Sequence, residues 1–185
     1  MAVAPRLRGQ AFQQAGEAAK DTALRVALHL DESVFPVQGP PGAGKTHTGA
    51  RMVSTLAKRG QTVGATANSH TVIGKLLDEA VAAATKDGHV VRCMQKVSDK
   101  EKDRPGIKLI TSNSEFLEAL QDDVSLGGAT AWFWARPDAK CSIDVLFIDE
   151  AAQMSLANVL AVSQAANSLV LLGDPRQLEQ PIQGS

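Results

Sequence analysis

A glycine-rich loop in the first quarter of the chain constrains the fold more than any other stretch. Residues 39–46 read Gly-Pro-Pro-Gly-Ala-Gly-Lys-Thr and fit the pattern G-x-x-x-x-G-K-[ST]. The glycines leave no side chain between backbone and ligand, so the N–H groups can turn toward phosphate oxygens. Residues 33–38 predict a strand before the loop, and residues 45–59 predict a helix after it. This strand–loop–helix unit predicts a phosphate-binding site, whereas a Gly/Pro-rich turn without a ligand is the simpler alternative.

Two side chains at the end of this loop give the site its chemistry. Lys45 can place an ammonium on the terminal phosphates of a nucleotide, and the Thr46 hydroxyl is the hard oxygen ligand that Mg²⁺ prefers. The helix that begins near Lys45 adds the positive end of its dipole. We therefore expect nucleotide contacts from Gly39, Gly42, Ala43, Gly44, Lys45, Thr46 and His47.

Composition limits the class of protein. The 185 residues suffice for one well-cored domain, and a net charge of −1 provides no overall basic field for nucleic acid, although a local binding face remains compatible with it. Cys93 and Cys141 lack the spacing of a metal site and indicate a reducing compartment. The sequence contains no apolar run of membrane-spanning length and no apolar signal core at its start, so we expect a cytoplasmic protein without a membrane partner.

The rest of the chain alternates between helical and strand patterns. This alternation, with several continuously apolar strands, predicts an α/β fold: a mainly parallel sheet between two helical layers. We expect one domain over 1–185, with a lead-in and helix over 1–32 and a core over 33–185; the charged stretch 96–106 predicts an exposed, mobile loop. The predicted helices are 17–30, 45–59, 70–85, 113–123 and 156–166, and the predicted strands are 33–38, 61–66, 89–94, 107–111, 127–135, 144–148 and 168–172.

Two adjacent carboxylates follow the apolar strand over 144–148. In a phosphate-loop protein, Asp149 at a strand end is suited to orient Mg²⁺, and Glu150 is suited to take the proton of an attacking water. Because ligands sit at the carboxyl ends of parallel strands, both residues can reach the phosphate loop. The alternative is structural, with Asp149 acting as a helix cap.

A third motif follows the last predicted strand. Residues 173–178 read Gly-Asp-Pro-Arg-Gln-Leu, and the Gln177 amide could sense a γ-phosphate or position water. Since Asp-Pro commonly forms turns, a β-turn explains the residues equally well on chemistry alone.

The three motifs together, GPPGAGKT, DEAAQ and GDPRQL, resemble motifs I, II and III of superfamily 1 helicases in order and spacing. The match is closest to the 5′-to-3′ branch that includes the nonsense-decay helicase. The strings TANSH and GATAWFWA resemble a narrower group that fuses a RecB-like nuclease to such a helicase. The resemblance covers about residues 34–185, more loosely over 86–126. It implies a RecA-like domain that binds ATP and Mg²⁺, with Lys45, Glu150 and Gln177 as catalytic residues and Thr46 and Asp149 at the metal.

The same resemblance implies a face for single-stranded nucleic acid, expected to be DNA rather than RNA. It assigns this face to Thr66, Asn68, Ser69 and Thr130, whose short polar groups suit contacts to phosphate and sugar. Trp132 and Trp134 would point to one side of a strand and could stack on bases, although core packing of both is the favoured alternative. A different surface, the basic residues between Lys96 and Lys108, is a further candidate.

The sequence departs from the family at several points. Ala43 stands where Thr or Ser is usual, and no glutamine before the loop clearly matches the family's adenine-reading position, with Gln13 and Gln14 the nearest candidates. The later motifs, the second RecA-like domain with its arginine fingers and a nuclease domain are not found in these 185 residues. We therefore expect a piece of a larger ATP-dependent helicase that is nearly inactive by itself. The alternatives are a P-loop kinase or GTPase-like enzyme, or a non-catalytic nucleotide-binding module.

Overall fold

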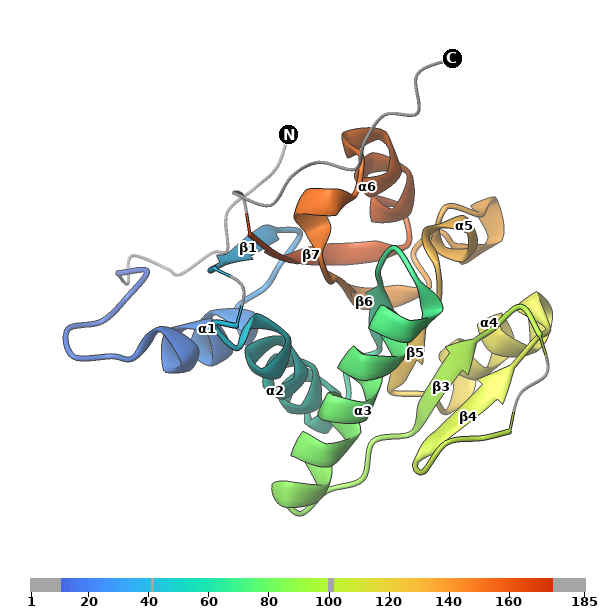
Figure 1. The fold of residues 1–185 in the computed structure, drawn as a ribbon, viewed down its shortest axis with the longest axis horizontal. Helices are drawn as coiled ribbons and strands as arrows, with labels where there is room; N and C mark the ends of the chain where they lie inside the picture. Colours follow the sequence, from blue (N-terminus) through green and yellow to red (C-terminus); the bar gives the residue numbers. More distant parts are fainter. Residues whose placement is uncertain (1–10, 41, 100–101, 175–185) are drawn as a thin grey trace.

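The computed structural model describes residues 11–40, 42–99 and 102–174. Within them lies a seven-stranded sheet in the order β1-β7-β6-β2-β5-β3-β4, and every pair of neighbouring strands is parallel (Figure 1). The carboxyl ends of the strands therefore meet at one edge of the sheet. The strands are β1 Val34–Gln38, β2 Val63–Thr66, β3 Cys93–Lys96, β4 Ile107–Ile110, β5 Leu126–Gly128, β6 Ile143–Ile148 and β7 Ala166–Gly173.

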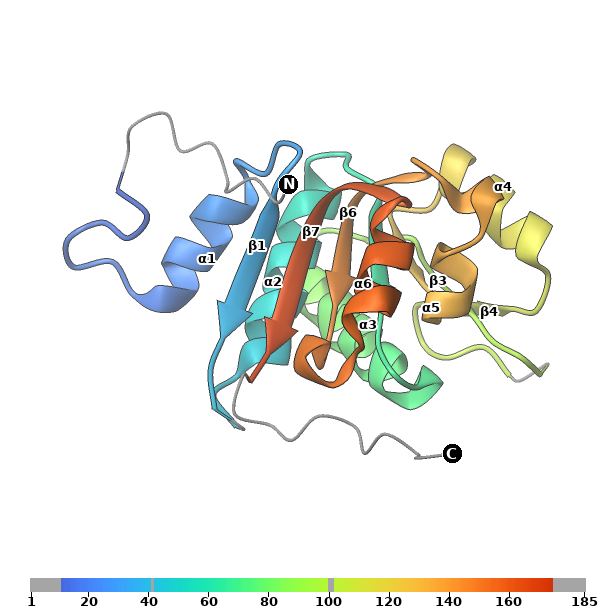
Figure 2. The same cartoon turned by 90° about the horizontal axis from the view of Figure 1, so that it is seen from above.

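Helices cover both faces of this sheet, which gives the expected three layers (Figure 2). One face packs against α1, α2 and α3, and the other packs against α4, α5 and α6. The helices are α1 Ala19–Ala27, α2 Lys45–Lys58, α3 His70–Lys86, α4 Asn113–Asp122, α5 Ala131–Trp134 and α6 Leu156–Ser163, with short 3-10 turns η1 Pro137–Ala139 and η2 Ala151–Gln153. The predicted α/β fold with a parallel sheet is confirmed.

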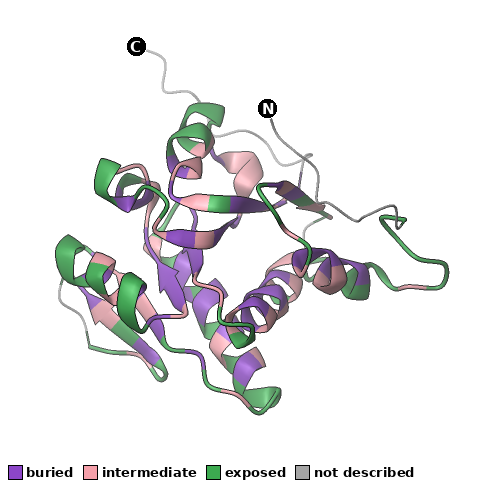
Figure 3. Cartoon of the chain, turned by 180° about the vertical axis from the view of Figure 1, so that it is seen from behind, coloured by how far each residue is buried: buried purple, intermediate pink, exposed green. Residues whose placement is uncertain are grey.

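Strand alternation divides the core between the two faces. Along β6, Val145 and Phe147 belong to the cluster under α1–α3, whereas Leu146 and Ile148 belong to the cluster under α4–α6. The central strands are buried on both sides, and exposed residues gather on the outer helix surfaces (Figure 3). This double burial explains why the strand sequences are continuously apolar.

Glycines let the helices approach the middle of the sheet. A Cβ on Gly128 would lie 2.6 Å from Leu77 Cδ1 of α3, and one on Gly127 would lie 2.6 Å from Leu120 Cδ2 of α4. The backbone of the short strand β5 therefore lies directly against side chains of α3 on one face and of α4 on the other. No larger residue fits there unless the helices move.

The predicted strand over 127–135 is wrong beyond Gly128. The chain leaves the sheet there and forms α5, with the Phe133 N–H donating to the Thr130 carbonyl at 3.0 Å. Trp134 is fully buried on α5 and makes edge-to-face contacts with Phe116 and Phe133, at ring-centroid distances of 6.1 and 5.1 Å. This aromatic packing overrides the strand preference of the same residues.

Other element boundaries also differ from those predicted. The strand expected over 89–94 is β3 Cys93–Lys96, because His89 closes the end of α3: its N–H donates to the Ala84 carbonyl at 3.0 Å, next to Gly88 at φ 73°. Helix α4 begins at Asn113 as predicted, and Ser112 caps it, because the Ser112 hydroxyl accepts from the Glu115 N–H at 3.3 Å.

The charged stretch 96–106 makes several contacts in its described part. Lys96 belongs to β3, and Arg104 pairs with Ile107 in an antiparallel bridge. The Asp103 carboxylate also accepts from the Leu109 N–H at 2.8 Å. The described second half of this stretch therefore contacts β4, and Arg104 also pairs with Asp78 of α3.

Candidate functional site

The motifs that the sequence singles out converge at the carboxyl edge of the sheet. The phosphate loop follows β1, Asp149 and Glu150 follow β6, and Asn68 and Ser69 follow β2. These strands lie in one half of the sheet: β2 is next to β6, and only β7 lies between β6 and β1. Gly173, the last residue of β7, accepts from the Gly39 N–H at 3.4 Å and so ties the third motif to the start of the loop.

The loop has the backbone that a phosphate cradle requires. Gly42 and Gly44 adopt φ values of 76° and 75°, which side chains rarely tolerate, and nothing lies within 4 Å of a Cβ placed on either. Gly44 is the N-cap of α2, so the first N–H groups of that helix open toward the loop. The Lys45 ammonium donates to the carbonyls of Gly39 at 2.7 Å and Pro40 at 2.9 Å, which holds it over the loop.

Thr46 and Asp149 form the candidate Mg²⁺ site. The Thr46 hydroxyl donates to Asp149 Oδ2 at 3.3 Å, and the Glu150 N–H donates to Asp149 Oδ1 at 2.9 Å. Burial raises the pKa of the Asp149 carboxyl, while these two hydrogen bonds and the charges of Lys45 and Lys75 act in the opposite direction. A hydroxyl beside a carboxylate at a phosphate loop suits an ion that takes few protein ligands and completes its shell with water and phosphate. In the described part of the chain, no group of three His, Cys, Asp or Glu residues could hold a metal by itself.

Glu150 lies at a strained turn directly after Asp149. Its φ of 53° places it in the left-handed region, where residues other than glycine are uncommon, and it precedes η2. The side chain is half-buried beside the candidate metal site. This position next to the Asp149 carboxylate is compatible with the role of a general base.

One of the predicted nucleotide contacts, His47, points away from the loop. His47 is exposed on α2, and its Nδ1 lies 3.9 Å from Glu79 Oε2 on α3, so its side chain faces the neighbouring helix. Only the backbone of His47 remains suited to a nucleotide contact. Gln177 lies outside the described residues, as does Pro41 of the loop.

The candidate nucleic-acid residues divide into exposed and buried members. Asn68 and Ser69 are exposed at the end of β2; the Asn68 amide donates to Gln153 Oε1 at 3.5 Å, and the Ser69 hydroxyl caps α3 by accepting from the Val72 N–H at 3.2 Å. Thr130 is half-buried at the N-terminus of α5. Thr66 is fully buried, and its hydroxyl has no partner in the described part of the chain. The Thr66 side chain is therefore not exposed for the contact with nucleic acid that the sequence predicts.

The two tryptophans have opposite environments. Trp132 is 88% exposed, whereas Trp134 is fully buried and its indole N–H donates to the carbonyls of Ala65 at 3.2 Å and Ala129 at 3.0 Å. Both the shared face and the shared core burial expected from the sequence are wrong, because about one turn of helix replaces the strand and residues two apart on it point to opposite sides. Trp134 thereby joins the ends of β2 and β5, from which the candidate nucleic-acid face is built. Sequence reasoning missed this contact, although Thr130 before an apolar run is a helix-start signal.

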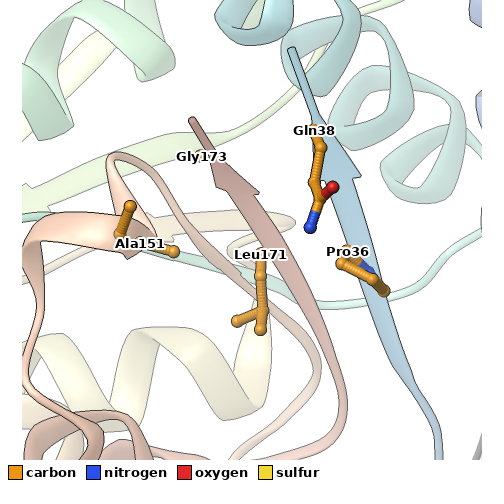
Figure 4. Close-up of a pocket in the computed structure, with 6 residues that line it drawn as sticks. Pro36, Gln38, Ala151, Leu171 and Gly173 are labelled. Carbon is orange, nitrogen blue, oxygen red and sulfur yellow. The ribbon is translucent and has the colours of Figure 1, made fainter. Parts of the chain in front are cut away.

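A cavity of about 300 Å³ lies beside the phosphate loop, between η2 and the face of the paired strands β1 and β7 (Figure 4). It is lined by Pro36 and Gln38 of β1, Leu171 and Gly173 of β7, and Ala151 and Ala152 of η2. The lining is mainly apolar, and Gly173 lets η2 approach closely, since a Cβ on it would lie 3.2 Å from the Ala152 nitrogen. The cavity is thus distinct from the polar cluster of Lys45, Thr46 and Asp149.

Comparison with known proteins fits this geometry. Residues 17–185 match the family described as an AAA domain. The chain belongs to this family. The AAA domain therefore accounts for the phosphate loop and for the parallel sheet that carries it. Among curated proteins, none matches the sequence significantly.

Solved structures share the fold of this AAA domain. A nuclease-deletion mutant of the Type ISP restriction-modification enzyme LlaGI, in complex with a DNA substrate mimic, superposes with a TM-score of 0.57 at 17% identity. The alignment covers 94% of this chain and 19% of that enzyme's chain, so this AAA domain spans about a fifth of LlaGI. The PRRSV nsp10 helicase gives a TM-score of 0.44 at 21% identity, covering 88% of this chain and 29% of that one. The LlaGI likeness shows a RecA-like α/β fold.

No helix in the described residues is long and apolar enough to cross a membrane.

Proposed function

We propose that this AAA domain is the ATP·Mg²⁺-binding motor domain of a superfamily 1 helicase, in which hydrolysis is coupled to movement along a single strand. The observation that carries the proposal is the 3.3 Å hydrogen bond between Thr46 and Asp149, with the Lys45 ammonium near enough for its charge to act on the Asp149 carboxyl. It brings together the cation, the hydroxyl and the carboxylate that ATP and Mg²⁺ require, from motifs 103 residues apart.

Each residue has a separate task in this function. With nucleotide bound, Lys45 would donate to phosphate oxygens instead of its carbonyl partners, and Thr46 and Asp149 would hold Mg²⁺, which would supply positive charge to the transferred phosphoryl group. Glu150 accepts the proton of the attacking water. Gln177 is proposed to sense the γ-phosphate.

The nucleic-acid face lies beside this site and not inside it. Asn68 and Ser69 are exposed at the end of β2. This strand is the direct neighbour of β6, and Asp149 follows β6. The hydrogen bond from Asn68 to Gln153 links this face to the segment that follows Glu150. We propose single-stranded DNA as the bound strand, and the DNA complex of LlaGI is a reason to test DNA first.

The isolated domain is proposed to be one part of a longer protein. Hydrolysis in such motors needs positive charge on the γ-phosphate from a second RecA-like domain, and an arginine finger contributes roughly 10³ to 10⁵ in rate. A nuclease domain in the same protein and a cytoplasmic location belong to the same proposal. Isolated residues 1–185 should accordingly bind ATP and barely hydrolyse it.

Nucleotide binding is the direct test. A fluorescent ATP analogue with Mg²⁺ is titrated into the wild type and into Lys45→Ala, with Lys58→Ala at the far end of α2 as the matched control. We expect Lys45→Ala to lose most of the affinity and Lys58→Ala to keep it, because only Lys45 reaches the loop. Unchanged affinity in Lys45→Ala would refute the nucleotide site. Stimulation of ATP hydrolysis by single-stranded DNA in the longer protein separates a helicase from a kinase, a GTPase or a non-catalytic module.

A further inference from the structure

A second cavity, of about 350 Å³, lies on the α3 side of the sheet between that helix and strands β3 and β4. Its wall includes His70 and Lys75 of α3, Gln95 of β3 and Arg104 from the stretch before β4. The cavity is separate from the phosphate loop, and neither the AAA domain match nor the three motifs account for its polar residues.

The Arg104 guanidinium is held in a fixed position at this cavity. Its Nη2 donates to Gln95 Oε1 at 2.6 Å and its Nη1 donates to Asp78 Oδ2 at 2.6 Å. Gln95 is itself only 3% exposed and anchored by donating to the His70 carbonyl at 2.9 Å. Gly74 leaves room for the guanidinium against the α3 backbone, because a Cβ there would lie 3.0 Å from Nη1. A buried side chain, a carboxylate and a glycine thus position one arginine.

This arginine keeps hydrogen-bonding capacity for a ligand. A guanidinium has five N–H donors, and within the described residues the side chain of Arg104 uses two of them. Its side chain is 30% exposed, so the remaining donors are accessible. A fixed planar fork of donors is the geometry that recognises phosphate oxygens.

The charge balance of the cavity favours an anion. Lys75 is exposed on its wall and adds a second cation, while Asp78 is the carboxylate that already pairs with Arg104. The balance is therefore one positive charge before any contribution from His70. Because the whole chain carries a net charge of −1, this local excess is not a general property of the surface.

The cavity continues the candidate nucleic-acid face. His70 directly follows the exposed residues Asn68 and Ser69, and α3 runs from there along the cavity. Lys75 is also close enough to Asp149 for its charge to act on that carboxyl. A strand lying across Asn68 and Ser69 can therefore pass directly onto Lys75 and Arg104.

We propose that this cavity binds a backbone phosphate of the single strand, with Lys75 and Arg104 as its cations. The proposal rests on the proposed function and extends it, since it gives the strand a path from the end of β2 along α3. Contacts to a phosphate carry no base information, which suits a motor that moves over any sequence. Arg104 before β4 and the residues after β2 then form one continuous surface.

Oligonucleotide binding as a function of salt tests this path. Anisotropy of a fluorescein-labelled oligodeoxythymidylate is measured with the wild type, Lys75→Gln and Arg104→Lys, and with Lys86→Gln as the matched control at the other end of α3. For each lost phosphate contact, the slope of log K against log salt should become shallower by about 0.7. We expect this loss for Lys75→Gln and weaker binding for Arg104→Lys, which keeps the charge but not the fork. Lys86→Gln should behave as the wild type, and thermal melts check that each variant is folded.

The outcomes separate this inference from the proposed function. If Asn68→Ala weakens binding but Lys75→Gln and Arg104→Lys do not, the phosphate subsite is overturned and the nucleic-acid face stands. An equal effect of Lys86→Gln would show non-specific attraction and overturn the subsite. If Lys75→Gln lowers affinity for the ATP analogue instead, Lys75 belongs to the nucleotide site and the phosphate subsite is overturned. If the wild type binds no oligonucleotide, both proposals fail.

Discussion

Replacing Trp134 by phenylalanine should destabilise the domain at the point where its two candidate sites meet. The indole is fully buried, and its N–H bridges the Ala65 and Ala129 carbonyls at the ends of β2 and β5. Phenylalanine keeps an aromatic ring against Phe116 and Phe133 but has no N–H group. The substitution therefore removes the bridge while preserving most of the apolar contact.

The expected cost follows from these contacts. Each lost hydrogen bond contributes about 1 kcal/mol, and the smaller ring leaves a residual cavity that adds to this. The Ala65 carbonyl keeps the Ala129 N–H as a partner at 3.0 Å, so the penalty of an unpaired buried carbonyl applies mainly to Ala129. We expect the free energy of unfolding to fall by about 2 to 3 kcal/mol, which lowers Tm by roughly 4 to 12 °C in a domain of this size.

Trp132→Phe is the matched control, because these are the only two tryptophans and Trp132 is 88% exposed. Urea unfolding of both variants should show a change within about 0.5 kcal/mol for Trp132→Phe. Each variant retains one tryptophan, so iodide should quench Trp132 in the Trp134→Phe protein and spare Trp134 in the other. Equal stability of the two variants, or equal quenching, would refute the assignment of Trp134 to the buried bridge.

Two further predictions concern the reaction, and a third concerns the pH dependence of stability. Glu150→Gln should bind the ATP analogue normally while turnover by the longer protein falls by about 10² to 10⁴-fold, and equal loss of binding would make Glu150 structural. Residues 1–185 alone should hydrolyse ATP near background, which robust steady-state hydrolysis sensitive to Lys45→Ala would contradict. Hydrogen bonding to Arg25 lowers the pKa of Glu17 to about 2 from 4.5, so its stabilisation is present above about pH 4.5 and lost as pH falls toward 2. Urea unfolding should therefore show a smaller acid-induced loss for Glu17→Gln than for wild type; equal losses would contradict this.

Much of the candidate nucleotide site could be predicted from the sequence because its determinants are local. The spacing of Gly39, Gly42 and Gly44 before Lys45 requires a loop with positive φ values followed by a helix, and the structure contains both. Apolar strands that end in the motifs place those motifs at one edge once the sheet is parallel. The approach of Thr46 to Asp149 follows from these two facts.

The nucleic-acid face could not be predicted as well, because exposure depends on packing between distant segments. Thr66 and Asn68 are two residues apart, yet the first is buried at the end of β2 and the second is exposed after it. The fixed position of Arg104 depends on Gln95, Asp78 and Gly74, which lie on two other elements. No local pattern in the sequence shows that these residues meet.

The sequence by itself determined that the chain forms alternating strands and helices around a phosphate loop, because glycine spacing and apolar periodicity act over a few residues. The tertiary structure decided which of two neighbouring tryptophans is buried, where the chain leaves β5, and which polar residues line the second cavity. In each of these cases the local preference is weak, and the energy of packing against α3 or the Phe116 cluster is larger. Contacts between segments distant in sequence therefore set the details of the surface, while local chemistry set the nucleotide loop.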